Sequence, residues 1–345
     1  MMGDAMGCCA NCFGDSFLSK QIDNYSLDRG TCSYCGASNA LLTDPVSLRD
    51  HFELLLGVYC EDSTGRTLVE WFKSDWNLFS SLSDAHCKDL LSEILDDGQI
   101  VRKRFRPALS DDGSSLERWQ RFRQELKHEN RFFPRNIPDL DRLGELLEGH
   151  LLAACEAVPD VLYRARIMEG NSVHPPDNMG KPPRELSTHG RANPAGIPYL
   201  YLASDVDTAI AEIRPHTGES VCVAEFKVIP KPRIADLRDP RSTISPFSLS
   251  DEHDIAQLRN EIDLLCQLSE ELTRPVFSKA AHLEYLPSQY LCEFIKHLGF
   301  DGVMYRSTAG QGTNYALFDD RSAEVREVRR YAVTRVSVQA ELMPD

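Results

Sequence analysis

The sequence predicts an α+β protein in which a zinc knuckle and a helical bundle precede a domain of mixed strands and helices. Three observations predict this order. Two CxxC motifs lie near the N-terminus, the middle of the chain shows almost only helical apolar spacing, and short strand-like runs dominate the second half. We expect the three parts to span residues 1–45, 46–157 and 158–345.

The overall composition is that of a globular protein. Of the 345 residues, 42% are hydrophobic and 26% are charged, and no run of about 18 apolar residues is present. The N-terminus lacks the basic-then-apolar order of a signal peptide, so we expect a cytoplasmic protein with no membrane partner. The formal charge of −15 excludes a protein whose whole surface serves nucleic acid.

The N-terminal cysteines predict a structural zinc site. Cys9 and Cys12 form one CxxC pair, and Cys32 and Cys35 form a second pair after nineteen intervening residues. This is the spacing of a four-thiolate zinc site, with Cys8 as a spare ligand that can replace Cys9. A redox role for either pair is the alternative. Because four thiolates leave no open position on zinc, we expect a folding or interaction module.

Residues 46 to about 155 carry almost no strand signal and predict a helical bundle. Gly, Pro and Asp clusters separate the amphipathic segments. These segments are 46–60, 84–97, 114–130 and 139–158.

One basic segment stands out in this acidic chain. Between Arg102 and Arg135 there are ten Lys or Arg residues and five Asp or Glu residues. The excess can serve a phosphate-bearing partner such as nucleic acid, an acidic neighbouring domain, or a solvated face at a dimer contact. Within it, Arg123 and His128 resemble the Arg-x4–6-His signature of HEPN domains, helical bundles that are often ribonucleases. Five helical residues place the two side chains about 140° apart, so they do not share a face.

The second half predicts an α+β domain, because strand-like runs outnumber helices and are irregularly spaced. The strands are expected at 161–167, 198–203, 220–229, 302–307, 314–319 and 331–342. The helices are expected at 205–214, 251–272 and 288–299. The Pro- and Gly-rich stretch 170–190 predicts a long loop that can cover a site.

A strand-to-helix unit at 197–215 contains a solitary carboxylate. Ser204 is the expected N-cap, with Asp207 three residues later as its partner. Glu212 then lies in the last turn, about 120° from the centre of the apolar stripe. Taken alone, such a residue is most often solvated.

An ordered set of residues in this half resembles the RES domain, which is named for an arginine, a glutamate and a serine. The resemblance covers residues 160–335, and the N-terminal half is similar to the HEPN-like extension of some RES proteins. The residues that carry the resemblance are Arg164, Gly190, Arg191, Asn193, Pro194, Gly196, Tyr201, Glu212, Ser307 and Asn314.

The resemblance implies a fold like that of ADP-ribosyltransferases and an enzyme that acts on NAD. Known members break the nicotinamide–ribose bond with phosphate or water as acceptor, and several are toxins neutralised by an antitoxin. The implied catalytic residues are Arg164, Glu212 and Ser307, and the implied NAD-binding residues are Arg191, Tyr201 and Asn314. Ser307 has no histidine beside it in the sequence to act as a base, so we assign it a hydrogen-bonding role.

The expected function is therefore phosphorolysis or hydrolysis of NAD by a toxin or defence effector that carries structural zinc. An antitoxin or regulatory protein and a second copy of the chain are the expected protein partners. Two alternatives stay open: a HEPN-type ribonuclease, and a non-catalytic sensor of NAD-like ligands. The stretch 237–288 sets the chain apart from small RES toxins, and it either carries extra helices or caps the site.

Overall fold

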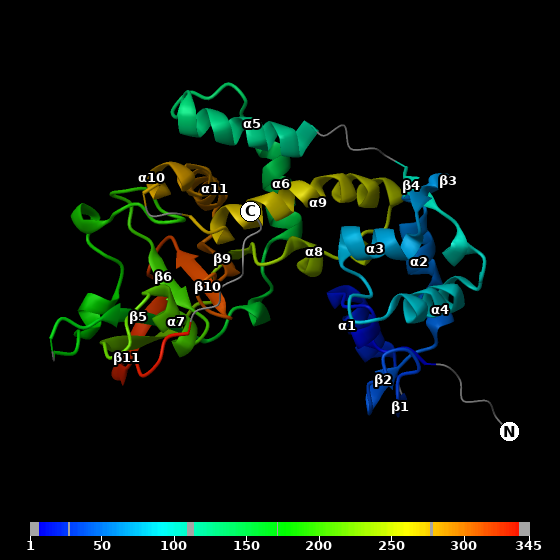
Figure 1. Ribbon diagram of the computed structural model, residues 1–345, viewed down its shortest axis with the longest axis horizontal. Coiled ribbons are helices and arrows are strands. Elements are labelled where there is room, and N and C mark those ends of the chain that lie inside the picture. The colour runs from blue at the N-terminus through cyan, green and yellow to red at the C-terminus, as the bar shows by residue number, and fades with distance from the viewer. Residues whose placement is uncertain (1–6, 27, 109–113, 171, 277–278, 338–345) are drawn as a thin grey trace, which may run out of the picture. The chain divides into compact units, whose positions relative to one another are not determined.

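A computed structural model describes residues 7–26, 28–108, 114–170, 172–276 and 279–337 (Figure 1). The chain forms two compact units, each assembled from separate stretches of sequence. The first unit is Met1–Glu117 with Asp239–Cys266, and the second is Arg118–Arg238 with Gln267–Asp345. A compact unit need not coincide with an autonomous domain, so the three-part division at 45 and 157 stays a prediction.

The first unit is mainly helical, as the apolar spacing predicts. Its elements are α1 (Ser16–Tyr25), β1 (Asp28–Gly30), β2 (Ala40–Leu42), α2 (Arg49–Leu56), β3 (Tyr59–Arg66), α3 (Leu68–Trp76), α4 (Asp84–Leu95), β4 (Phe105–Pro107), α8 (Pro240–Thr243) and the start of α9 (Glu252–Thr273). Phe13, Phe52 and Phe79 are fully buried and their rings pack together at centroid distances of 5.8–6.0 Å. These rings supply a core that the short helices cover.

The pairing of β3 with β4 adds a short two-stranded sheet to the helical bundle that residues 46 to about 155 predict. The two strands are antiparallel, and the indole N–H of Trp71 donates to the carbonyl oxygen of Phe105 at 2.7 Å. A Cβ at Gly65 would lie 1.9 Å from that same oxygen, so only glycine permits the approach. Such pairing depends on residues about 40 positions apart, which local spacing does not reveal.

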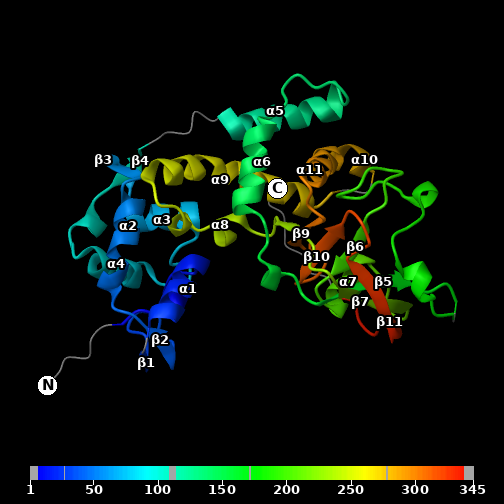
Figure 2. The same cartoon turned by 180° about the vertical axis from the view of Figure 1, so that it is seen from behind.

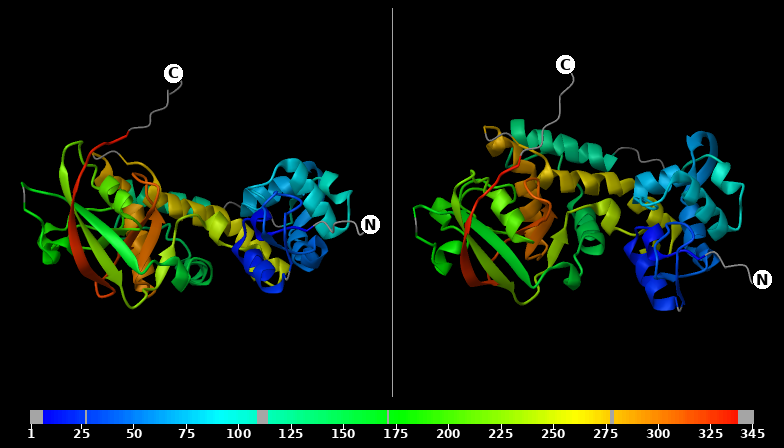
Figure 3. Two further views of the ribbon diagram at one scale, coloured as in Figure 1. Left: turned by 90° about the horizontal axis from the view of Figure 1, so that it is seen from below. Right: turned by 60° about the horizontal axis from the view of Figure 1, so that its bottom comes forward.

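The second unit contains a seven-stranded sheet with the order β11-β7-β5-β6-β10-β9-β8 (Figure 3). All neighbouring strands are antiparallel except β8 and β9, which are parallel. The strands are β5 (Val161–Ile167), β6 (Leu200–Ala203), β7 (Ser220–Val228), β8 (Ile234–Asp236), β9 (Gly302–Arg306), β10 (Thr313–Leu317) and β11 (Ala323–Ala332). The α+β class is confirmed, but the last strand ends at Ala332, whereas the sequence predicts a strand at 331–342, part of which lies outside the described residues.

Helices accompany this sheet. They are α5 (Ser114–His128), α6 (Leu140–His150), α7 (Val206–Glu212), the end of α9, α10 (Ala281–Glu284) and α11 (Leu286–His297). The helix α7 lies beside the sheet, next to β5 and β7 (Figure 2). It packs against β5, β6 and β7 through a small apolar cluster that includes Ala209, Ala203 and Val223. Small side chains at this contact bring α7 close to the sheet and fix the position of its last residue, Glu212.

The segment 168–199 connects β5 to β6, and apart from residue 171, which lies outside the described ranges, its regular structure is two short 3-10 turns, Pro176–Met179 and Arg184–Leu186. This agrees with the long loop that the proline and glycine content predicts. Across the described residues, no helix combines the length and the apolar character that crossing a bilayer requires.

Part of the basic segment forms an ionic cluster within the second unit. Glu271 at the end of α9 is fully buried; its carboxylate lies 3.1 Å from Arg123 Nε and accepts from the indole N–H of Trp119 at 3.3 Å. Lys127 and Arg274 each contact the Glu284 carboxylate at 2.6 Å. Burial raises the pKa of Glu271, and the charge of Arg123 opposes that shift. These basic residues therefore neutralise acidic groups of the same unit.

The HEPN-like pair does not converge here. Arg123 is committed to Glu271, while His128 is exposed at the end of α5. The following loop exposes Phe132 and Phe133 at 82% and 81%. Nothing in this geometry favours a ribonuclease site.

The ionic cluster predicts unequal effects for two neighbouring glutamates. Glu271→Ala leaves the largely buried Arg123 with only the more distant Glu284 carboxylate, at 3.8 Å, so the free energy of unfolding should fall by about 3 kcal/mol. Glu270→Ala, at an exposed position of the same helix, should change it by less than about 0.5 kcal/mol. Urea unfolding of the full chain measures both, and equal effects would show that the cluster contributes little.

Candidate functional site

A cavity of about 240 Å³ lies in the second unit between the sheet and α7. It contains four of the six NAD-site residues predicted from the sequence, namely Arg164, Tyr201, Glu212 and Asn314. The other lining residues are Tyr163, Ala165, Leu202, Ala203, Ala209, Ile213 and Tyr305. Strands β5, β6, β9 and β10 and the helix α7 all contribute, so only the folded sheet assembles the site.

Glu212 is fixed by two neutral donors. The hydroxyl of Ser307 and the side-chain amide of Asn314 both donate to its Oε1 atom at 2.6 Å. No donor from the described residues contacts Oε2, which leaves this oxygen for a ligand. The arrangement orients the carboxylate without neutralising its charge by a cation.

Ser307 is placed as an orienting residue. Its Oγ accepts from the backbone N–H groups of Ala309 at 3.2 Å and Gly310 at 2.8 Å while donating to Glu212. A hydroxyl oxygen has two lone pairs, and both are occupied here. This geometry supports a hydrogen-bonding role for Ser307. The sequence around Ser307 does not reveal its acceptor, Glu212, because the two residues lie 95 positions apart.

Arg164 brings a half-buried cation to the cavity. Its Nη1 donates to the carbonyl oxygen of Tyr201 at 3.3 Å, and its buried Nε has no hydrogen-bond partner. Among the described residues, no carboxylate lies within ion-pair distance of this guanidinium. Burial, assisted by the charge of Arg166, lowers the pKa of Arg164 to about 10, so the group is still protonated at neutral pH. Such a cation suits an anionic ligand group.

Tyr201 is locked by the loop that precedes its strand. Its buried hydroxyl donates to Asn193 Oδ1 at 2.8 Å and accepts from the backbone N–H of Ala192 at 3.1 Å. A Cβ at Gly190 would lie 2.5 Å from the Tyr201 hydroxyl, so glycine is required there. Burial raises the pKa of Tyr201, which keeps the phenol neutral. The sequence around 190–196 therefore positions Tyr201.

Arg191 lies outside the cavity that contains Glu212. Its guanidinium donates to the carbonyl oxygens of Arg274 at 2.7 Å and Leu272 at 3.3 Å, and it lies 5.5 Å from the centre of the Tyr285 ring. It does not line the cavity. The structure therefore brings five predicted residues together, counting Ser307 through its bond to Glu212, and leaves the anion-binding role of Arg191 as a prediction.

Comparison with known proteins identifies this part of the chain. Residues 161–339, just over half of the chain, match the family model described as "RES domain". The chain belongs to the RES domain family. A comparison with curated protein sequences gives no significant match. Among solved structures, the M. tuberculosis MbcT–MbcA toxin–antitoxin complex is similar over 55% of this chain and 92% of that chain, with 12% identity and a TM-score of 0.33, which is too low to show a shared fold.

A clamp that the sequence did not reveal holds the glycine-rich loop of the RES domain. Thr208 Oγ1 accepts from the backbone N–H of Gly312 at 3.1 Å, and Ser204 Oγ accepts from that of Thr313 at 3.0 Å. Asp205 Oδ2 accepts from both hydroxyls, at 2.9 and 2.7 Å. The clamp thus connects the start of α7 to the loop that carries Ser307.

Asp205 also corrects the predicted helix cap. Its Oδ1 accepts from the backbone N–H of Thr208 at 2.7 Å, which makes it the N-cap of α7 in place of Ser204. Asp207, the predicted capping partner, is exposed. Ser204 is instead used by the clamp, a role that depends on the pairing of β6 with β10. The sequence pattern S-D-x-x-T, at residues 204–208, supplies both the N-cap aspartate and the two hydroxyls of the clamp.

The four predicted zinc ligands converge in the first unit. The sulphur atoms of Cys9, Cys12, Cys32 and Cys35 all lie within 4.8 Å of one another. A tetrahedral zinc ion with bonds of about 2.3 Å separates its sulphur ligands by about 3.8 Å, so the cluster fits zinc. Cys8 is outside the cluster and contacts the carbonyl oxygen of Thr43.

The close approach of Gly312 to Asp205 predicts that a side chain at position 312 destabilises the fold. A Cβ at Gly312 would lie 2.2 Å from Asp205 Oδ2, so Gly312→Ala should lower the free energy of unfolding by about 1–3 kcal/mol. Gly149→Ala in α6 is the control, because nothing lies within 4 Å of its added Cβ, and it should be neutral or slightly stabilising. Thermal unfolding compares the two, and a neutral Gly312→Ala would contradict the clamp.

The cysteine cluster predicts one zinc ion per chain. Cys12→Ser should abolish zinc binding and lower the unfolding temperature of the first unit, because a short cysteine module without metal lacks a sufficient core. The control is Cys60→Ser, since Cys60 is exposed and far outside the cluster in sequence. Inductively coupled plasma mass spectrometry of the purified protein measures the number of zinc ions per chain. Full zinc occupancy in Cys12→Ser would rule out the four-thiolate site.

Proposed function

We propose that this RES domain is an enzyme that cleaves the nicotinamide–ribose bond of NAD. The observation that carries the proposal is the Glu212 carboxylate, held by Ser307 and Asn314 in one cavity with the unpaired cation of Arg164. This cavity combines a free anionic oxygen and a half-buried cation, which is what a ligand with a cationic ring and an anionic phosphate requires.

The chemistry needs only one carboxylate. Nicotinamide is attached to ribose as a cationic pyridinium and leaves as a neutral molecule, so no general acid is required, unlike ordinary glycoside hydrolysis. Glu212 stabilises the positive charge that develops on the ribose, through the Oε2 atom, which accepts from no donor among the residues that the structure describes. Ser307 and Asn314 keep the carboxylate oriented throughout.

The cavity volume indicates which part of NAD it receives. About 240 Å³ is below the roughly 300–1,000 Å³ typical of pockets for whole ligands. We infer that nicotinamide and its ribose enter the cavity while the adenosine half lies outside. Arg164 then binds either the adjoining phosphate or an attacking inorganic phosphate, and Tyr201 supplies an aromatic wall.

The biological role we propose is that of a toxin or defence effector restrained by an antitoxin or regulatory protein. The basis is the family, since several RES proteins are toxins of this kind. The zinc module provides no catalytic position, because four thiolates complete its coordination, and its role is to fold or contact a partner.

The Glu212 assignment predicts loss of catalysis. Glu212→Gln removes the negative charge and should lower the rate of nicotinamide release from NAD by about 100-fold or more. Asp207→Asn, an exposed change on the same helix, should retain the wild-type rate. Chromatography of free nicotinamide measures both. Full activity of Glu212→Gln would end the assignment, and NAD binding without turnover in the wild type would favour the sensor function.

The same assay assigns the acceptor. ADP-ribose formed without added phosphate indicates hydrolysis, whereas a phosphate-dependent rate with a phosphorylated ADP-ribose product indicates phosphorolysis.

The bonding of Ser307 predicts partial loss of activity. Ser307→Ala removes one of two donors to Glu212, so kcat should fall by about 10–100-fold, with Asn314 still holding the carboxylate. A nucleophilic serine would instead give a loss as large as that of Glu212→Gln. Steady-state kinetics of the two variants distinguish these roles.

A further inference from the structure

A second cavity, of about 870 Å³, lies at the opposite end of the same strands. Strand β10 runs from Asn314 in the Glu212 cavity toward Phe318 in the second one, and β9 runs from Asp301 in the second cavity toward Ser307. The two cavities share no lining residue among those described. The second cavity is therefore a separate place in the RES domain, and its volume is that of a pocket for a whole small ligand.

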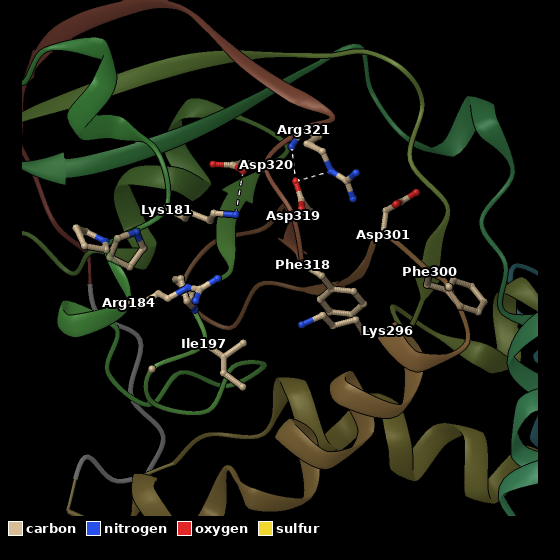
Figure 4. Close-up of a pocket in the computed structure, with 15 residues that line it drawn as sticks. Lys181, Arg184, Ile197, Lys296, Phe300, Asp301, Phe318, Asp319, Asp320 and Arg321 are labelled. Atoms are coloured by element: carbon tan, nitrogen blue, oxygen red, sulfur yellow. Dashed lines mark hydrogen bonds and ion pairs between the residues drawn. The ribbon is translucent and has the colours of Figure 1, made fainter.

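Two ion pairs each join two residues that line this cavity. Lys181 Nζ lies 2.9 Å from the Asp320 carboxylate, and Arg321 Nε lies 3.0 Å from that of Asp319 (Figure 4). The remaining acid, Asp301, accepts from the backbone N–H of Arg233 at 2.8 Å. Asp319 and Asp320 are therefore paired with cations, whereas Asp301 keeps its negative charge and is engaged by a neutral backbone donor.

Two cations are engaged weakly or not at all. Among the described residues, Arg184 has no ion pair or hydrogen bond with a side chain. The Lys296 ammonium makes only a long ion pair, at 3.8 Å, with the Glu293 carboxylate, which also accepts from the Tyr199 hydroxyl. Arg184 and Lys296 come from different segments and extend into the same hollow (Figure 4). Both side chains are positively charged, so an anionic ligand in this cavity is attracted by both.

The rest of the wall is apolar. Ile197 is 37% exposed, and Pro182, Pro183 and Pro198 line the same space. Phe318 packs against Tyr199 at a centroid distance of 4.8 Å, and Lys296 lies 5.3 Å from the centre of that tyrosine ring. The cavity therefore offers a surface for a flat apolar group beside the two cations.

We propose that this second cavity binds a phosphate monoester with an apolar body, such as a nucleoside monophosphate. The phosphate lies between Arg184 and Lys296, where the guanidinium fork and the ammonium match a dianion, and the apolar body lies against Ile197 and the prolines. The proposal does not depend on NAD cleavage, because it uses a different cavity and different residues.

Calorimetric titration of the full chain with AMP, adenosine and inorganic phosphate tests the proposal. AMP should bind at least tenfold more tightly than either adenosine or phosphate, since each of these lacks one half of the recognised group. The double variant Arg184→Gln with Lys296→Gln should weaken AMP binding tenfold or more. Both side chains are exposed, so the variant should fold normally.

The matched control is Arg321→Gln, which removes a cation that Asp319 already engages and should change the AMP affinity by less than twofold. Unchanged AMP affinity in the double variant would overturn the proposal, because the ligand would then occupy another place such as the Glu212 cavity. Phosphate binding as tightly as AMP would also overturn it, since the apolar wall would play no part. Loss of NAD cleavage in Glu212→Gln leaves all these outcomes unchanged.

Discussion

The carboxylate of Glu212 accepts from a hydroxyl and an amide, and much of the second unit is arranged to keep these two neutral donors in position. A cation at the same distance would orient the carboxylate equally well, but it would cancel the negative charge that the proposed reaction needs beside the developing oxocarbenium ion. Neutral donors avoid this cancellation. Their cost is that they must be positioned by the backbone, because a hydroxyl and an amide attract a carboxylate less strongly than a guanidinium does.

That positioning depends on how a loop meets a helix. The residues after β9 turn tightly enough for Ala309 and Gly310 to donate to Ser307, and Gly312 then passes so close to α7 that no side chain fits. The clamp of Ser204, Asp205 and Thr208 fixes the same loop from the other side. Helix α7 therefore carries Glu212, the proposed catalytic carboxylate, at one end, and at the other end it supports the loop that holds the Ser307 donor.

The sequence could predict the helices and strands, but not the tertiary contacts between them. The α+β class, the cysteine cluster and the strand or helix that carries each of Arg164 and Glu212 follow from local patterns. The contact of Asn314 with Glu212 depends on the register in which Asn314 opposes Ala203, about 100 residues away, and no local pattern encodes it. Arg191 shows the converse: its glycine-flanked loop predicts an anion site, but its partners are carbonyl groups at the end of α9.

The stretch that sets this chain apart from small RES toxins is divided between the two units. Residues 239–266 fold with the N-terminal helices, and Arg259 lies 2.6 Å from the buried Asp75 carboxylate, which also accepts from the Tyr59 hydroxyl. Its composition alone could indicate extra helices, but not which unit would bury them. An ion pair between residues 184 positions apart is a tertiary property, visible only when both partners are in place.

Arg164 and Glu212 carry opposite charges in one cavity, yet they form no ion pair with each other among the described contacts. If they did, each would satisfy the other, and a ligand would have to break the pair before binding. Kept apart, they match a molecule that is cationic at its ring and anionic at its phosphates. The buried Nε of Arg164 has no hydrogen-bond partner, which is a destabilising feature of the free protein that the proposed anionic ligand would offset. The unfavourable burial of this guanidinium is therefore consistent with selection for ligand binding over stability at this position.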